Sequence, residues 1–288
     1  MNAQDSEPLS YQHYNFKKAR VAFTLIDSGY PNGMRMIVKR EKMVIFRGNF
    51  MRVSEKPKYV PLDSTTNAFL FTESSGGMHC CATLYLAISD STGFRMADTI
   101  FLRDGDYKLR DLDGDGKPEV LATIDYFPYS WTSFSGSDYD LSIYSITRSG
   151  LREVTRNYPD GIERMIRGYM KIIHEVKPKI TKEEIEEAAK GDESGMDIPS
   201  DNMGQYKPEI EISQKEASLQ FDMDPEYIGE LKQELACLLI ADISIGREDE
   251  GWQVIRKQFP YKGRDRFFNV LKREVAERTG WYKPRTGE

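Results

Sequence analysis

Histidine and cysteine are scarce in this sequence, with three of each among 288 residues. His79, Cys80 and Cys81 are adjacent, which raises the question of a zinc site. Successive residues on a strand point to opposite faces of the sheet, so these side chains are not expected to converge on one ion. A bond between neighbouring cysteines would be strained, so we interpret Cys80 and Cys81 as small buried residues. A disulfide between one of them and Cys237 is the alternative.

Long apolar segments and an excess of positive charge are also missing. No apolar run approaches the about 20 residues of a membrane-spanning helix, and the start of the chain has no signal-peptide pattern. The net charge is −6 and neither half of the chain is basic, so a general electrostatic attraction to nucleic acid is not expected. Residues 1–8 are polar. An exported protein whose signal peptide has been removed can begin in this way, and so can a cytosolic protein.

Catalytic motifs are absent from the sequence as well. No Gly-x-Ser-x-Gly nucleophile motif occurs. Ser74 and Ser75 precede two glycines and His79, but no recognisable spacing connects either serine with both an aspartate and a histidine. We therefore predict no catalytic residue and no residue that binds an organic cofactor.

One short segment, residues 111–119, is rich in carboxylates and glycine, and it predicts a metal site. Its acidic residues occupy relative positions 1, 3, 5 and 9, and Gly114 and Gly116 allow the sharp turns that bring them together. Calcium fits this loop better than magnesium, because it accepts more oxygen ligands in a flexible geometry. The carbonyl oxygen of Lys117 is the natural fifth ligand. The predicted ligands are Asp111, Asp113, Asp115, Lys117 and Glu119.

Two other interpretations of this loop must be weighed. An EF-hand would require a glutamate at position 12 and helices on both sides, but position 12 is Ala122, and residues 106–110 and 120–126 have the β-branched and aromatic content of strands. A simple hairpin turn would also be rich in Asp and Gly. The regular spacing of the carboxylates favours a calcium loop between two strands.

The pattern Asp-x-Asp-Gly-Asp-Gly-x-Pro-Glu before a hydrophobic strand resembles the calcium loop of FG-GAP (VCBS-type) repeats, which form the blades of integrin-α propellers. The resemblance implies that the Asp side chains, a backbone carbonyl and the acid at position nine hold calcium. More weakly, residues 75–85, the aromatic stretch after the loop and residues 241–252 resemble bacterial secreted or envelope proteins of unknown function. Only one copy of the loop is present. A complete propeller, which needs roughly four or more blades, is not expected.

The pattern along the chain predicts an α+β protein. Up to about residue 150, short β-branched and aromatic runs are separated by Gly and Asp, which is typical of antiparallel strands joined by short turns. We expect one β-domain, a sandwich or a set of partial propeller-like sheets. The predicted strands are 20–26, 34–39, 43–50, 69–72, 80–88, 95–102, 106–110, 120–126 and 139–146.

After residue 150 the spacing of apolar residues changes to that of helices. Residues 151–189 are expected to form connecting helices, the second of which begins at a Thr181–Glu184 capping box. Residues 190–208 are polar and rich in Gly, Asp and Ser, so they predict a flexible linker. Residues 209–288 contain three further amphipathic stripes and predict a helical C-terminal domain.

These patterns favour a binding or interaction protein with a structural calcium ion. Because millimolar calcium is an extracellular condition and such loops are commonly adapted to it, we expect a periplasmic or extracellular location. The partner would be a protein or a glycan. The aromatic stretch 126–134 could form an exposed binding platform, but packing in the core is the expected role. The alternative function is a hydrolase of an envelope polymer, with its site near the calcium loop and this stretch.

Overall fold

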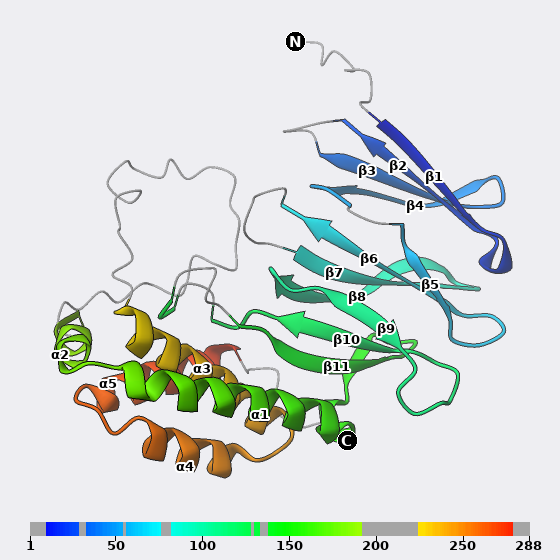
Figure 1. The fold of residues 1–288 in the computed structure, drawn as a ribbon. Helices are drawn as coiled ribbons and strands as arrows, with labels where there is room; N and C mark the ends of the chain where they lie inside the picture. Colours follow the sequence, from blue (N-terminus) through cyan, green and yellow to red (C-terminus); the bar gives the residue numbers. More distant parts are fainter. Residues whose placement is uncertain are drawn as a thin grey trace, which may run out of the picture. The chain divides into compact units, whose positions relative to one another are not determined.

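The computed structural model describes residues 10–28, 33–53, 56–75, 82–127, 130–132, 138–191 and 224–278. It has the predicted α+β architecture, with antiparallel sheets followed along the chain by helices (Figure 1). The chain divides into two compact units. The β-unit comprises Met1–Asp125 and Tyr139–Pro159, and the helical unit comprises Tyr126–Asp138 and Asp160–Glu288. The domain boundaries suggested by sequence composition stay predictions.

Within the described residues, the β-unit forms three four-stranded sheets, and each is built from consecutive antiparallel strands. The first sheet consists of β1 (Ser10–Phe16), β2 (Val21–Asp27), β3 (Met34–Arg40) and β4 (Met43–Phe50). The second consists of β5 (Lys58–Pro61), β6 (Asn67–Ser74), β7 (Ala82–Asp90) and β8 (Gly93–Arg103). The third consists of β9 (Tyr107–Arg110), β10 (Glu119–Ile124), β11 (Asp140–Ile146) and β12 (Leu151–Glu153).

The first two sheets share a hydrophobic core. On β3 the alternation is regular, since Met36 and Val38 are buried while Arg35 and Lys39 are exposed. Strands with this pattern bury one face and leave the other in water. The buried faces meet through aromatic rings, and the ring centroids of Phe23 and Phe69 lie 5.0 Å apart. A continuous core therefore holds β1–β4 against β5–β8.

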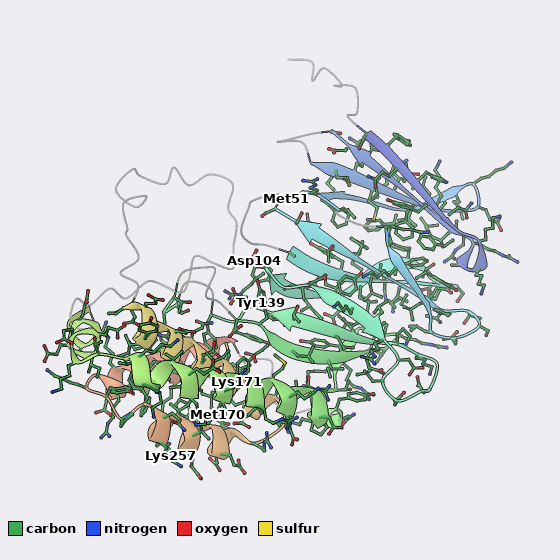
Figure 2. The ribbon with its side chains drawn as sticks, viewed as in Figure 1. Met51, Asp104, Tyr139, Met170, Lys171 and Lys257 are labelled. Atoms are coloured by element: carbon green, nitrogen blue, oxygen red, sulfur yellow. The ribbon has the colours of Figure 1, made fainter. Side chains whose placement is uncertain are left out.

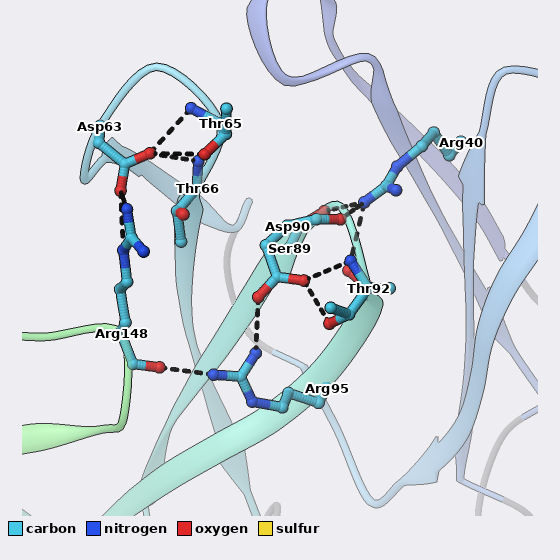
Figure 3. Close-up of polar contacts among 10 residues, drawn as sticks. Arg40, Asp63, Thr65, Thr66, Ser89, Asp90, Thr92, Arg95 and Arg148 are labelled. Carbon is cyan, nitrogen blue, oxygen red and sulfur yellow. Dashed lines mark hydrogen bonds and ion pairs between the residues drawn. The ribbon is translucent and has the colours of Figure 1, made fainter.

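Arginines connect the turns at one end of the three sheets (Figure 3). Arg40, at the end of β3, donates a 2.6 Å hydrogen bond to the carbonyl oxygen of Asp90 in the β7–β8 turn. Arg95 pairs with the Asp90 carboxylate at 3.1 Å and also donates to the carbonyl oxygen of Arg148. The guanidinium of Arg148, in the β11–β12 turn, forms an ion pair with Asp63 at 2.8 Å. This arginine chain links turns from all three sheets.

The helices are α1 (Pro159–Val176), α2 (Lys182–Gly191), α3 (Glu226–Ser244), α4 (Glu248–Gln258) and α5 (Arg264–Arg278). The predicted capping box is confirmed at the start of α2. Glu184 Oε2 accepts the backbone N–H of Thr181 at 2.9 Å, and the backbone N–H of Glu184 donates to Thr181 Oγ1 at 3.1 Å. Lys171 and Lys257 project from the exposed faces of α1 and α4 (Figure 2). In the described residues, no helix is long and apolar enough to span a membrane.

Helix α3 forms the centre of the helical unit and differs from the predicted amphipathic stripe. It is buried around its whole circumference, including the polar residues Lys232, Gln233 and Glu234. Such a helix belongs inside a core rather than on a surface. The charge of Lys232 is compensated by Asp224, whose carboxylate lies 2.9 Å away. Apolar spacing located the helix correctly but did not reveal that its polar side is also covered.

The aromatic stretch after the metal loop packs in the helical unit wherever the structure describes it. Phe127 and Trp131 are buried, and their ring centroids are 5.3 Å apart. Trp131 also meets Phe267 of α5 edge to face at 5.5 Å. The expectation of core packing is confirmed for these rings. They are therefore not available as an exposed binding platform.

Two sequence-based predictions fall wholly or mostly outside the described residues. The first is the pairing of Cys80 or Cys81, which both lie outside the described residues. The second is the linker 190–208, of which only the first two positions are described. Cys237 is buried in α3, and its sulfur lies 3.7 Å from Gln233 Nε2, which donates to it.

Candidate metal centre

The carboxylate-rich loop connects β9 and β10 as a hairpin of the third sheet. Arg110 and Glu119 pair across the two strands, so the intervening residues form the turn. Gly114 and Gly116 have φ angles of 78° and 86°. Side chains other than glycine are unfavourable in this left-handed region. The two glycines therefore allow the backbone to curl back twice within a few residues, as the sequence predicts.

The three aspartates of the loop converge. One carboxylate oxygen from each of Asp111, Asp113 and Asp115 lies within 4.8 Å of the others, and all three residues are exposed. Asp111 is held by two backbone contacts, because its oxygens accept the N–H groups of Gly114 at 2.7 Å and Gly116 at 3.0 Å. The backbone thus orients the first carboxylate towards the interior of the turn.

The next two carboxylates are also fixed by the loop backbone. Asp113 Oδ1 accepts the N–H of Asp115 at 3.1 Å, and Asp115 Oδ1 accepts the N–H of Lys117 at 2.7 Å. Three negative charges held this close repel one another, and a divalent cation would offset that repulsion. A set of carboxylate oxygens suits hard cations such as Ca²⁺ or Mg²⁺ rather than softer metals that prefer nitrogen or sulfur. The residues present therefore fit a metal ion.

Glu119 closes the loop from the first residue of β10. It is buried, and its Oε2 accepts the backbone N–H of Leu112 at 2.9 Å. The structure thus brings together the three predicted aspartate ligands and places Glu119 against the base of the same turn. The role of Lys117 as a carbonyl ligand stays a prediction. Its backbone N–H is engaged by Asp115.

Tyr158 also belongs to this site, although no motif in the sequence indicates it. Its hydroxyl donates to Asp113 Oδ2 at 3.3 Å. Burial, together with the charges of Glu119 and Asp113, raises the pKa of Tyr158 to about 12. The two residues are 45 positions apart. No local motif could have predicted the contact, because it depends on how the segment after β12 folds back on the loop.

A cleft of about 440 Å³ lies beside the loop. One wall is formed by the loop itself, through Asp115, Lys117 and Glu119. The β5–β6 connection contributes Asp63, and the β11–β12 hairpin contributes residues that include Arg148 and Arg152. Asp115 and Glu119, two of the predicted calcium ligands, therefore also face a space large enough for a small molecule.

Comparison with known proteins gives distant relatives over part of the chain. No known family matches it, and no solved structure does. A stretch of 95 residues is 27% identical to a probable thylakoid lumen protein of Synechocystis sp., covering 32% of this chain and 28% of that protein. A stretch of 88 residues is 27% identical to an uncharacterized protein of Sinorhizobium fredii, covering 31% of this chain and 14% of the relative. The matched stretches thus cover less than a third of either relative's length.

Proposed function

We propose that the loop of residues 111–119 is a calcium site of the FG-GAP type. The observation that carries the proposal is the convergence of three aspartate oxygens within 4.8 Å on a turn shaped by two glycines with positive φ. Glu119 and the carbonyl oxygen of Lys117 complete the proposed ligand set. The setting supports the resemblance, since propeller blades are four-stranded antiparallel sheets and the loop belongs to such a sheet.

The proposed ion stabilises the fold and performs no chemistry. All of its proposed protein ligands lie in one hairpin, in the loop after β9 and at Glu119, the first residue of β10. Binding to the folded state alone raises the free energy of unfolding by RT ln(1 + [Ca²⁺]/Kd), which is about 2.7 kcal/mol at one hundred times Kd. The gain comes from relieving repulsion among carboxylates that the folded loop holds together.

The proposed role of the whole protein is binding or interaction outside the cytoplasm, in a periplasmic or extracellular space. Loops that bind calcium weakly suit compartments with millimolar calcium. The relative named as a probable thylakoid lumen protein supports a location of this kind. The partner would be a protein or a glycan. The cleft beside the loop supplies a concave polar surface for such a role.

The alternative, a hydrolase, would be favoured by two carboxylates of raised pKa facing one pocket. Burial raises the carboxyl pKa at Glu230 and Asp242, and both residues lie in α3 of the helical unit. In the cleft, the pKa of Asp63 is instead lowered, chiefly by a hydrogen bond from the backbone of Thr65. These directions favour the binding role over acid–base catalysis at the cleft.

Calorimetric titration of the full chain with calcium tests the proposal. We expect one site to saturate at millimolar calcium or below, and the melting temperature to rise with calcium concentration. Asp113→Ala should abolish both effects, because it removes one of the three converging carboxylates. Glu186→Ala, which removes an exposed carboxylate from α2, should leave both unchanged. Melting that is indifferent to calcium in the unsubstituted protein would contradict the proposal.

A further inference from the structure

The cleft beside the metal loop contains equal numbers of acidic and basic side chains, but only one acidic and one basic residue form an ion pair with each other. The acidic residues are Asp63, Asp115 and Glu119, and the basic residues are Lys117, Arg148 and Arg152. Asp63 and Arg148 neutralise each other, because Arg148 Nε and Nη2 lie 3.0 and 2.8 Å from Asp63 Oδ2. Two acidic and two basic groups remain.

The remaining basic groups are not engaged by carboxylates. In the part of the chain that the structure describes, neither Lys117 nor Arg152 forms an ion pair. The Nε atom of Arg152 donates a long hydrogen bond of 3.4 Å to the hydroxyl of Ser145, its neighbour across the β11–β12 pair. Both basic residues are exposed to solvent at the cleft.

The remaining acidic groups, Asp115 and Glu119, are both ligands in the proposed calcium site. A bound calcium ion would offset half of the charge of the four loop carboxylates, which also include Asp111 and Asp113, and would increase the influence of Lys117 and Arg152 on an approaching anion. Without the ion, the two carboxylates would repel an anion that approached the same space. Calcium therefore makes the charge that the cleft offers to a ligand more positive, because the charged side chains of the cleft sum to zero without the ion.

We propose that the calcium-loaded cleft binds a small ligand bearing a carboxylate, with Arg152 as its principal partner. This inference rests on the proposed calcium site. A guanidinium matches a carboxylate through two parallel hydrogen bonds, which Lys117 cannot reproduce but can assist as a point charge. The volume of about 440 Å³ suits a sugar acid or an organic acid. None of the described lining residues is aromatic, so recognition relies on charge and hydrogen bonds rather than on ring stacking.

Titration with glucuronate tests the proposal, with succinate and glucose as comparison ligands. The full chain is used once with saturating calcium and once after the metal has been removed and the chelator dialysed away. Glucuronate should bind the calcium-loaded protein at least roughly tenfold more tightly than the metal-free protein, the factor expected for about one charge-assisted hydrogen bond. Glucose lacks the carboxylate, so it should bind the calcium-loaded protein at least roughly tenfold more weakly than glucuronate does.

Substitutions locate the binding to the cleft. Arg152→Gln should weaken glucuronate binding roughly tenfold while calcium binding is unchanged, because it removes the charged partner without touching a metal ligand. Lys108→Gln is the matched control, since it removes an exposed positive charge from β9 that does not line the cleft. It should change neither affinity. An unchanged calcium isotherm also shows that each variant is folded.

The outcomes separate this inference from the proposed function. Calcium uptake without glucuronate binding would overturn the inference and leave the calcium site intact. Absence of calcium uptake would overturn both. Equal glucuronate binding with and without calcium, or equal binding of glucose, would overturn calcium-dependent recognition of a carboxylate. Tighter binding of glucuronate than succinate would support a sugar acid as the source of the carboxylate, and the reverse order would support a free organic acid.

Discussion

Asp63 shows how one half-buried carboxylate can organise the connection between two strands and also reach a neighbouring sheet. Its Oδ1 accepts the backbone N–H groups of Thr65 at 2.8 Å and Thr66 at 2.9 Å, and its Oδ2 pairs with Arg148 (Figure 3). The backbone hydrogen bond from Thr65 is the largest cause of a carboxyl pKa well below the usual 3.8. The hydroxyl of Thr65 and the guanidinium of Arg148 act in the same direction.

The lowered pKa of Asp63 predicts that this residue makes the stability of the fold depend on pH. Because the folded protein binds the Asp63 proton less readily than the unfolded chain, the stabilisation is complete above the ordinary pKa of 3.8 and is lost as pH falls towards the folded value. Asp63→Asn should therefore lower the free energy of unfolding at pH 6, and this difference should shrink below about pH 4. Urea unfolding of both proteins across this range measures it. A difference independent of pH would assign the loss to geometry rather than to ionisation.

The metal loop also shows which residues can be found from sequence. The aspartates at 111, 113 and 115 could be predicted because their convergence depends on a few neighbouring dihedral angles and two glycines. Tyr158 and Arg152 could not, because their positions depend on strand pairing and on how the chain returns after β12. Local spacing therefore predicts the metal ligands but not the side chains that surround them.

Among the described elements, every central strand was predicted, and so were three of the edge strands: β4, β8 and β9. Strand β4 runs from Met43 to Phe50, as its β-branched and aromatic residues predict. Three strands escaped prediction, and each lies at the edge of its sheet: β1, β5 and β12. An edge strand can carry few buried side chains or be very short, and its alternation is then weak. Strand β1 is mostly exposed, and strand β12 is only three residues long.

Substituting Arg40 tests how much the hydrogen bonds between the first and second sheets contribute to stability. Besides its bond to the Asp90 carbonyl, its Nη2 donates to the Ser89 hydroxyl at 2.9 Å. Arg40→Met keeps most of the aliphatic stem and removes these bonds, so we expect a loss of about 1.5 kcal/mol, the lower figure for hydrogen bonds to a charged group, since the site is partly exposed. Chemical denaturation measures the change.

The matched control is Arg35→Met on the same strand. Arg35 is exposed, and the same change in side chain should alter stability by less than about 0.5 kcal/mol, as for most surface substitutions. Equal losses for the two variants would show that the Arg40 hydrogen bonds contribute little.

In the whole molecule, the boundary between the two units crosses the chain three times. The segment Tyr126–Asp138, between β10 and β11, belongs to the helical unit, whereas both flanking strands belong to the β-unit. The change from strand-like to helical spacing of apolar residues predicts a domain boundary near residue 150. The same spacing does not predict that the segment Tyr126–Asp138 belongs to the helical unit. That assignment depends on aromatic rings finding partners in helices far along the sequence.

Trp131 provides a test of this assignment. Trp131→Ala should destabilise the helical unit by about 3–5 kcal/mol, the usual cost of deleting a large buried aromatic side chain. Thermal unfolding followed by circular dichroism at a helical wavelength measures the loss. Tyr11→Ala removes an exposed ring from β1 and should have little effect. If the helical signal of the Trp131 variant melts at the original temperature, the segment does not contribute to the helical core.

The consecutive order of strands within each sheet has a consequence for how the protein folds. Each sheet is complete once its own stretch of chain has emerged: residues 10–50, then 58–103, then 107–153. Short separations between paired strands lower the entropy lost on loop closure and favour fast folding. Because synthesis proceeds from the N-terminus, the chain can form its sheets one after another as it is made. Trp131 is the exception, because its partner Phe267 is made late, and the helical core must wait for the last helix.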